Sequence, residues 1–348
     1  MHILSAVATT FLLTVAMPAR AAGLDQETTI PGNGWSLPAT LVLPESGPAP
    51  CVVFFAGSGP SDRDWKSPLL PGSNGSAKQL AAALLAKGIG SIRFDKVGSG
   101  VNMPKSAAPE ELKKLDVLSM AHYVDEANAA FDFLAKRAEC GRIFLLGHSE
   151  GSIHMFSAAA SRQTELRFGG MISLSGPSRS LLDTVIEQVH ASHAKAGGDL
   201  APVDRQLAEF RSAMLKPDAP APDFSLIPEA AAIWQMAHAP AQQRVARELL
   251  LADPLVSVKA FNGRALVVSA ARDAQVPPSD GDRIFAALPG DATKKTRVVI
   301  ANANHVFKTE TRDPASLSAQ QITMSYADGG HDLAGGLVDS IAAFVSAK

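Results

Sequence analysis

The sequence predicts an α/β fold: a mostly parallel, doubly wound sheet with a helical cap inserted into it. Up to about residue 175, short apolar runs alternate with longer amphipathic stretches, which is the rhythm of right-handed βαβ units. The apolar runs lack polar alternation, as expected of strands buried on both faces of a sheet. From about Ser180 to Phe261 only helix-like segments follow, and then the strand–helix alternation resumes.

This break divides the chain into a main domain and a cap. We expect the main domain to comprise residues 22–177 and 263–348, and segment 178–262 to lie as a helical cap over the carboxyl ends of the strands. Hydrophobic residues make up 46% of the 348, which is ample apolar material for one large core.

The main domain opens with a predicted hairpin, in which strands at 27–30 and 39–43 flank the turn Pro31-Gly32-Asn33-Gly34. The elements that we expect next are strand 50–56, helix 76–87, strand 89–94, an amphipathic helix at 117–138, strand 142–146, a helix to about residue 160 and strand 170–175.

The cap is predicted to consist of helices, which Gly197-Gly198 and the proline-rich linker 217–222 interrupt. The predicted cap helices are 181–194, 203–215, 229–237 and 242–251. After the cap, strands at 265–269 and 297–300 and a last helix at 333–345 complete the main domain.

The most informative stretch is a tight turn, Gly147-His148-Ser149-Glu150-Gly151, between a buried strand and a helix. A residue held at the tip of such a turn leaves no room for a neighbouring Cβ, so glycine must flank it. The Ser149 hydroxyl then points out of the carboxyl edge of the sheet, above the positive end of the next helix. The pattern predicts a nucleophilic serine, and a merely structural turn is the alternative in a chain with 27 glycines.

A serine hydroxyl attacks at neutral pH only with a base beside it and a group that orients the base. In an open α/β sheet, both must come from the carboxyl ends of neighbouring strands. Asp273 follows strand 265–269 and His305 follows strand 297–300, which gives the chain order Ser, Asp, His. We expect His305 to be the base for Ser149 and Asp273 to fix its tautomer. The rivals are His331 in a loop, Asp253 in the cap linker, and Asp280 and Asp282 at a helix start.

The tetrahedral oxyanion needs two N–H donors that are already in place. One is expected from the backbone of Glu150, directly after the nucleophile. The other is expected from the loop Gly57-Ser58-Gly59-Pro60, where Ser58 is the first choice and Gly59 the second. A plain glycine turn is the alternative for this loop.

No cofactor and no metal are expected, because the chain has neither a Walker loop nor a Gly-x-Gly-x-x-Gly after a strand. The other histidines lack metal-ligand spacing: His148 and His154 are expected to pack beside the turn, and His122, His190, His193 and His238 to lie on helix surfaces. Ion pairs that brace loops are expected from Asp62, Arg63, Asp64, Asp95 and Lys96.

The N-terminal segment is typical of an export signal. An apolar stretch from Ile3 to Val15 precedes Ala19-Arg20-Ala21-Ala22, a small-x-small cleavage pattern. We therefore expect residues 1–21 to be a signal peptide and the mature chain to be periplasmic or secreted. The stretch is too short for a comfortable membrane span, so stable membrane insertion is not expected.

Charge and cysteine content narrow the partners and the chemistry further. A net charge of −2 without a basic run offers nucleic acid no binding surface. The two cysteines, Cys51 and Cys140, exclude a disulfide-dense scaffold and a Cys-rich metal site. They precede strands that we expect to lie side by side, so a disulfide and two buried free thiols are both open.

The chain resembles an α/β-hydrolase of the bacterial serine-esterase and serine-aminopeptidase-like branch. The matching motifs are Ala56-Gly57-Ser58-Gly59-Pro60 with Asp62-Arg63-Asp64, Phe94-Asp95-Lys96 with Gly98 and Gly100, Gly147-His148-Ser149-Glu150-Gly151, Arg272-Asp273-Ala274-Gln275-Val276-Pro277 and Asn304-His305. The chain departs from the family pattern at Val97, where arginine is usual, at Ala270 or Ala271, and at Ser152, where glycine is usual.

The resemblance implies hydrolysis of carboxylic esters, less often of amides or thioesters, through an acyl-serine and without a metal. We therefore expect an exported carboxylesterase that acts on small or medium acyl esters. An aminopeptidase-like or acyl-peptide hydrolase is the alternative among enzymes. A non-catalytic ligand-binding protein on a hydrolase scaffold is the alternative outside them.

Overall fold

A computed structural model describes residues 25–45, 47–70, 72, 74–106, 108–216, 218–239, 243–327 and 331–347. The predicted signal peptide, residues 1–21, lies outside the described residues. The strands are β1 (Gln26–Pro31), β2 (Ser36–Val42), β3 (Ala49–Phe55), β4 (Gly90–Phe94), β5 (Cys140–His148), β6 (Phe168–Leu174), β7 (Ala265–Ala270) and β8 (Lys295–Ile300).

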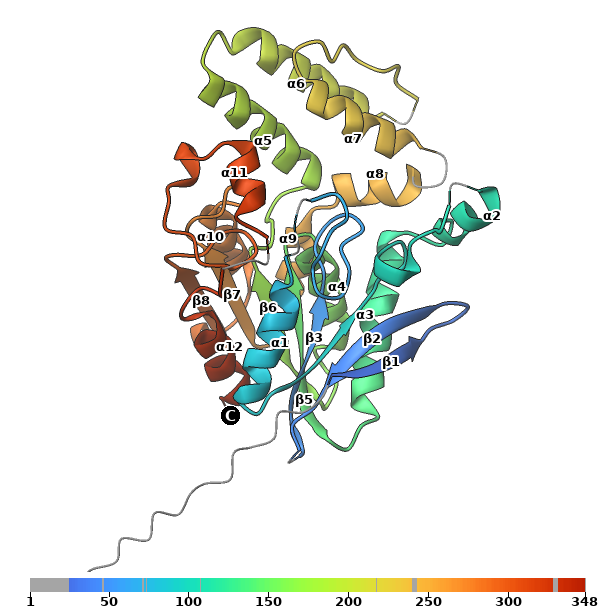
Figure 1. Ribbon diagram of the computed structural model, residues 1–348, viewed down its shortest axis with the longest axis vertical. Helices are drawn as coiled ribbons and strands as arrows, with labels where there is room; N and C mark the ends of the chain where they lie inside the picture. The colour runs from blue at the N-terminus through green and yellow to red at the C-terminus, as the bar shows by residue number, and fades with distance from the viewer. Residues whose placement is uncertain are drawn as a thin grey trace, which may run out of the picture.

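These strands form one sheet in the order β1-β2-β4-β3-β5-β6-β7-β8 (Figure 1). β1 pairs with β2 and β2 pairs with β4 in antiparallel fashion, and every later pairing is parallel. The α/β class and the mostly parallel sheet predicted from the sequence are therefore confirmed. Parallel strands place their carboxyl ends at one edge, so the loops after β3, β4, β5, β7 and β8 meet there.

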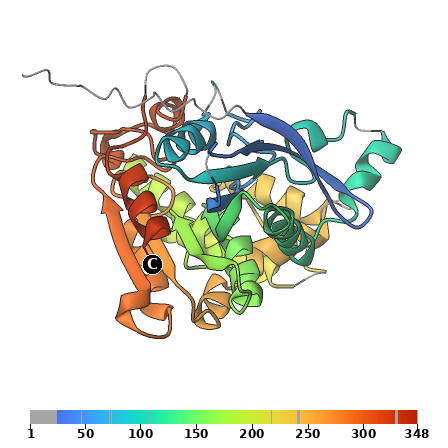
Figure 2. The same ribbon diagram turned by 90° about the horizontal axis from the view of Figure 1, so that it is seen from below.

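Helices cover both faces of the sheet, as the two views show (Figures 1 and 2). One face packs against α1 (Ser76–Ala86) and α12 (Leu337–Ser346), and the other against α3 (Met120–Ala135), α4 (Gly151–Arg162) and α10 (Pro278–Ala287). Side chains of β3 alternate accordingly: Val53 faces α3 and α4, whereas Val52 faces α1 and α12. Both faces are buried, which explains why the strands are unbroken apolar runs.

The described residues between β6 and β7 form the helices α5 (Leu181–Ala196), α6 (Ala201–Met214), α7 (Pro228–His238), α8 (Gln243–Leu251) and α9 (Pro254–Lys259). Helices α5 to α8 share an apolar cluster of their own, which contains Phe210 and Trp234. Val258 of α9 belongs instead to the apolar cluster on the face of the sheet that α3, α4 and α10 cover. In Figure 1, α5 to α8 lie beyond the tips of the strand arrows, over the carboxyl edge. No helix among the described residues is long and apolar enough to cross a membrane.

Some elements differ from the prediction. α3 is shorter than the predicted 117–138, because Ser119 ends the preceding turn and its hydroxyl accepts the His122 N–H at 3.0 Å. α12 begins at Leu337 instead of residue 333, where Leu333 still forms a β-bridge with Lys308. The sequence reasoning missed α9 and two other short helices, α2 (Pro109–Leu112) and α11 (Ala319–Met324).

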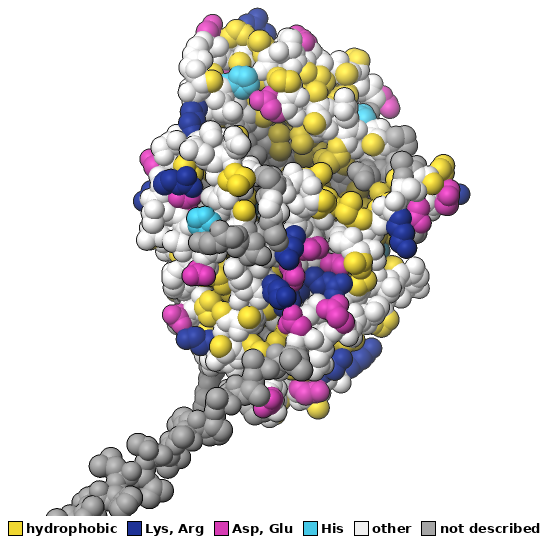
Figure 3. Space-filling view, viewed as in Figure 1, with side chains coloured by type: hydrophobic (Ala, Val, Ile, Leu, Met, Phe, Trp, Pro, Cys, Tyr) yellow, Lys and Arg dark blue, Asp and Glu magenta, His cyan; other side chains and the backbone are white. Residues whose placement is uncertain are grey.

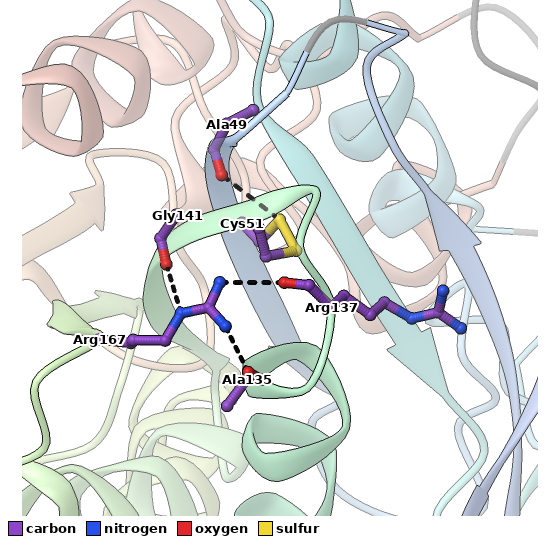
Figure 4. Close-up of a disulfide and its surroundings, with 7 residues drawn as sticks. Ala49, Cys51, Ala135, Arg137, Gly141 and Arg167 are labelled. Carbon is purple, nitrogen blue, oxygen red and sulfur yellow. Dashed lines mark hydrogen bonds between the residues drawn. A yellow bond between two sulfur atoms is a disulfide. The ribbon is translucent and has the colours of Figure 1, made fainter.

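Cys51 and Cys140 form a disulfide between the parallel neighbours β3 and β5, with Cα atoms 5.6 Å apart (Figure 4). Both residues are buried. Beside the bridge, the Arg167 guanidinium donates to the carbonyl oxygens of Ala135, Arg137 and Gly141, which holds the turn before β5. Of the two possibilities that the sequence left open, the structure contains the disulfide.

Candidate active site

Ser149 lies at the turn between β5 and α4, where the spacing of the glycines predicted it. Its φ of 53° is left-handed, an unusual conformation for a residue with a side chain and one that functional sites often hold. The Ser149 N–H donates to the Leu174 carbonyl at the end of β6, and the Ser149 carbonyl accepts the Ser152 N–H, both at 2.9 Å. These two bonds fix the strained turn from both sides.

The two flanking glycines are required by close packing. A Cβ on Gly147 would lie 2.6 Å from the carbonyl oxygen of Gly151, and a Cβ on Gly151 would lie 2.5 Å from that of Ala56. Both contacts are with backbone, so no side-chain rotation could relieve them. The steric reason predicted for this glycine pattern is therefore confirmed.

Asp273 and His305 form a buried pair at the same edge of the sheet. His305 Nδ1 lies 2.8 Å from Asp273 Oδ2 and 3.0 Å from Oδ1. Asp273 Oδ1 also accepts the backbone N–H groups of Gln275 at 2.8 Å and Val276 at 2.9 Å. The carboxylate thus accepts the Nδ1 proton, which leaves His305 Nε2 as the basic nitrogen.

The environment of Asp273 keeps its carboxyl group ionised. Burial raises the pKa of Asp273, but the charge and the ring N–H of His305, together with the two backbone N–H groups, outweigh burial and leave this pKa below its ordinary value. An ionised Asp273 stabilises positive charge on His305, which is the charge that develops when the ring takes a proton.

His148 links the His305 loop to the nucleophile turn. The Nε2–H of His148 donates to the backbone carbonyl of His305 at 2.8 Å, and the two ring centroids are 4.9 Å apart. On its other side, the His148 ring stacks on Trp65, with centroids 4.4 Å apart. Among the described residues the Ser149 hydroxyl has no hydrogen-bond partner. The hydrogen bond between a serine and its base often forms or shortens only when substrate is bound.

The two residues predicted to supply the oxyanion donors are Glu150, within the Ser149 turn, and Ser58, in the loop after β3. A Cβ on Gly57 would lie 3.2 Å from Ser149 Cβ, so the loop after β3 packs against Ser149. Within the described part of the chain, neither the Ser58 N–H nor the Glu150 N–H has a hydrogen-bond acceptor. An oxyanion that develops on an acyl group needs two N–H donors that are not already paired. Gly59, the second choice for this donor, is not crowded, since a Cβ there would lie 4.0 Å from Leu69 Cδ1.

Comparison with known families agrees with this geometry. The family model described as serine aminopeptidase, S33, matches residues 72–312. The chain belongs to this family of α/β hydrolases. The resemblance inferred from the motifs and the fold class predicted with it are both confirmed.

Individual relatives add detail at lower similarity. Esterase EstD of Thermotoga maritima is 28% identical to this S33 family member over 165 residues, which is 47% of this chain and only 35% of EstD. The solved structure of DcsB, a complex with its substrate analogue, is similar in fold, with a TM-score of 0.52, 14% identity, and coverage of 92% of this chain and 98% of that chain. The 2,6-dihydroxy-pseudo-oxynicotine hydrolase has a TM-score of 0.49 at 18% identity, covering 89% of this chain and 70% of that one.

The rival site residues of this S33 family member lie elsewhere. Asp253 caps α9 by accepting the Leu255 N–H at 2.9 Å, and Asp282 pairs with Arg297 at 3.0 Å. Asp280 is fully buried and accepts from Ser178 and Arg179 at the entrance to α5. Among the described residues, His331 has no hydrogen bond to any of these carboxylates, and residues 328–330 of its predicted loop lie outside the description.

The remaining histidines and charged loop residues give a mixed outcome. His122 is buried and lies 3.2 Å from Glu126, so its predicted place on a helix surface is wrong. The predicted loop brace is confirmed for Arg63, which lies 2.9 Å from Asp95. Among the described residues, no group of three or more His, Cys, Asp or Glu side chains could hold a metal ion.

Two contacts at the site were not foreseen. Lys96 forms an ion pair, as predicted, with Glu150 at 3.6 Å, and its ammonium also donates to the Gly57 carbonyl at 2.7 Å. Tyr326 is buried in the long segment between β8 and α12. Its hydroxyl accepts a hydrogen bond at 2.8 Å from Gln275, in the loop after β7 that carries Asp273 (the acid loop). Every residue has a backbone carbonyl, and Tyr326 is far from Gln275 in the sequence. No motif or spacing therefore indicates either contact, and neither could have been predicted.

The site makes the stability of this S33 family member sensitive to acid. Burial, and then repulsion by His305, lower the pKa of His148 to about 3. Between about pH 6.5 and pH 3 the unfolded chain protonates His148 but the folded chain does not, so stability falls as the pH falls. At about pH 5 this single group is expected to cost about 2 kcal/mol of the free energy of unfolding relative to pH 7.

A glutamine at position 148 can donate to the same carbonyl without titrating. His148→Gln is therefore expected to flatten the loss of stability between pH 7 and about pH 5, measured by urea denaturation. His190→Gln, on the exposed side of α5, is the matched control and should keep the wild-type dependence. An equal loss of stability in wild type and His148→Gln would contradict the expectation.

Proposed function

We propose that this S33 family member is an exported serine hydrolase that cleaves carboxylic esters through an acyl-Ser149 intermediate. The observation that carries the proposal is the buried Asp273–His305 pair, whose loop is hydrogen-bonded to His148, the residue next to the nucleophile. A buried base that an anion orients, close to the half-buried hydroxyl of a strained turn, is the arrangement that activates serine.

The proposed reaction has two halves. His305 Nε2 takes the Ser149 proton as Oγ attacks the acyl carbon, and the oxyanion is held by the N–H groups of Ser58 and Glu150. The C–O bond of the ester then breaks, and the leaving alcohol receives the proton from His305. Water repeats the sequence on the acyl-serine, releases the acid and regenerates Ser149.

The choice of ester over amide rests on the relative EstD, whose printed name is esterase. Peptide hydrolysis is the second candidate, favoured by the description of the matching family as serine aminopeptidase. An aminopeptidase needs an unpaired carboxylate for the substrate amine. Glu187 on α5, which lines the cavity beside Asp273, forms an ion pair with Arg179. This pairing supports the ester reading.

Helices α5 to α8 are proposed to act as a cap that shapes the substrate site. Figure 3 shows a hollow below α6 and α7 in which hydrophobic side chains gather. A cavity of about 530 Å³ also lies between α5, the acid loop and segment 314–322, lined in part by Ala191, Gln275, Leu317 and Ile322. Apolar space of this size suits small or medium acyl or alcohol groups.

Export is proposed from the N-terminal apolar segment and is supported by the Cys51–Cys140 disulfide, since disulfides persist mainly in oxidising compartments. A mature protein that begins at Ala22 and is recovered from the periplasm or medium of a bacterial host would agree with this proposal. Retention of residues 1–21 in a cytoplasmic product would contradict it.

Covalent labelling tests the enzyme proposal directly. A fluorophosphonate is expected to phosphonylate Ser149 in the folded wild type, with the adduct mapped by mass spectrometry, and Ser149→Ala should not label. A panel of p-nitrophenyl esters and aminoacyl-anilides then separates ester from peptide hydrolysis. Folded wild-type protein that neither labels nor turns over any ester would instead indicate a binding protein on a hydrolase scaffold.

A further inference from the structure

Lys96 is a buried cation that the reaction above does not use. We propose that its ammonium positions both oxyanion donors, and so stabilises the transition state without contributing to substrate binding. The inference rests on the proposed function, because it gives Lys96 a part in the same oxyanion hole. Lys96 is a positioning residue in this account, since it acts through backbone groups and does not touch the substrate.

The ammonium of Lys96 contacts the peptide unit that contains one donor and the side chain of the residue that supplies the other. Its ammonium donates to the Gly57 carbonyl at 2.7 Å and lies 3.6 Å from the Glu150 carboxylate. The side chains of Lys96 and Glu150 are only 8% and 7% exposed. The Gly57 carbonyl and the Ser58 N–H belong to the same peptide unit. The other proposed donor is the backbone N–H of Glu150.

Peptide geometry turns the first contact into control of a donor. In a trans peptide the C=O and N–H bonds point in opposite directions within one plane. Holding the Gly57 oxygen toward Lys96 therefore turns the Ser58 N–H away from Lys96. Glycine on both sides of Ser58 lets this peptide rotate at little steric cost. A hydrogen bond from outside the loop is therefore needed to hold the peptide in one orientation.

Strand order explains why a residue in the loop after β4 can reach both donors. The sheet runs β4-β3-β5, so β3 lies between the strand that precedes Lys96 and the strand that precedes the nucleophile turn. Lys96 crosses the end of β3, meets the loop there and continues to Glu150. The acid and base come from β7 and β8 on the other side of β5. The oxyanion loops are thus braced from the side opposite the acid–base pair.

The second contact holds the start of α4. Burial raises the pKa of the Glu150 carboxyl, but Lys96 and His154 outweigh it and lower the pKa to about 2, so Glu150 is an anion. His154 Nε2 lies 3.5 Å from the same carboxylate oxygen. Fold stability alone does not call for this arrangement, because apolar residues can often replace a buried ion pair without loss. The short Lys96 contact with a loop carbonyl indicates a function in placing that loop.

Four variants separate positioning from structure. Lys96→Met removes the ammonium, and the double variant Lys96→Met/Glu150→Gln does so without leaving a buried lone carboxylate. Lys96→Arg retains a cation that can donate to the Gly57 carbonyl. Lys87→Met is the matched control, because Lys87 is half-exposed on the far end of α1 and pairs with Asp339.

The measurements are kcat on a p-nitrophenyl ester, the inhibition constant of a boronic acid, substrate affinity and thermal unfolding. The double variant is expected to lose about 10²–10³-fold in kcat, and to bind the boronic acid more weakly by a similar factor, because that tetrahedral adduct places an oxygen in the oxyanion hole. Substrate affinity, measured with Ser149→Ala added to both proteins, should change by less than about three-fold. Lys96→Arg should recover part of the loss, and Lys87→Met should match wild type.

Two results would overturn the inference. One is a folded double variant with wild-type kcat and boronic acid affinity. The other is a loss of kcat matched by an equal loss of substrate affinity, which would indicate a general structural effect. Either result leaves the proposed function intact if wild type still labels at Ser149. Absence of wild-type labelling at Ser149 would instead remove the proposed function, and the inference with it.

Discussion

Asp273→Asn is expected to lower kcat for ester hydrolysis by about 10⁴-fold while the protein keeps its fold. The loss is predicted to come from the wrong tautomer of His305. The replacement is nearly isosteric, and the pocket around Asp273 is already filled by hydrogen bonds from Gln275, Val276 and His305. We therefore expect the variant to fold although His305 can no longer act as a base.

The hydrogen bonds decide which way the asparagine amide points. Backbone N–H groups of Gln275 and Val276 bind Asp273 Oδ1, and only an oxygen can accept them. The amide nitrogen then takes the place of Oδ2, which is 2.8 Å from His305 Nδ1, and donates to that nitrogen. His305 must carry its proton on Nε2, and an Nε2–H cannot accept a proton from Ser149.

A matched control separates this effect from the loss of a charge. Asp282→Asn makes the same chemical change on α10, where the side chain is 67% exposed and pairs with Arg297. It should alter kcat by less than about two-fold, because exposed ion pairs contribute little. Steady-state kinetics and thermal unfolding of both variants are the measurements. Near-wild-type kcat in folded Asp273→Asn would remove Asp273 from the mechanism.

The geometry of the Ser149 turn was predictable because its constraints lie within a few adjacent residues. Gly147 and Gly151 are needed where any Cβ would meet backbone, and a pattern of five residues records that need. The pairing of Asp273 with His305 was predictable for a different reason. A parallel sheet gathers the carboxyl ends of its strands, so a polar residue after an apolar run can be assigned to the site without knowledge of its contacts.

Features that depend on contacts between distant segments were not predictable. What distinguishes Lys96 from other loop lysines is its hydrogen bond to the Gly57 carbonyl. Because every residue has a backbone carbonyl, the sequence does not show which one accepts this bond. His122 has helical spacing that fits an exposed face, yet the edge of Trp35 and the carboxylate of Glu126 cover it. Helix α9 has six residues, too few for a hydrophobic period to stand out.

Loss of the Cys51–Cys140 disulfide is expected to lower the free energy of unfolding by about 3–5 kcal/mol. The bridge joins residues separated by 89 positions in the sequence. In the chain-entropy account, a cross-link of this span removes about 4–5 kcal/mol of conformational freedom from the unfolded chain. Urea denaturation of wild type with and without a thiol reductant measures the effect, and Cys51→Ala/Cys140→Ala is the control, since its stability should not respond to reductant.

Activity should respond differently from stability. The bridge lies near the amino ends of β3 and β5, whereas the loop with Ser58 and the turn with Ser149 follow the carboxyl ends of the same strands. Main-chain pairing along both strands continues between the two ends, so the folded reduced protein should keep its loops in place and retain kcat within about two-fold. Unchanged stability after complete reduction would show that the unfolded chain gains little freedom from breaking the link. A large fall in kcat under conditions where the protein stays folded would show instead that the bridge helps to align the catalytic loops.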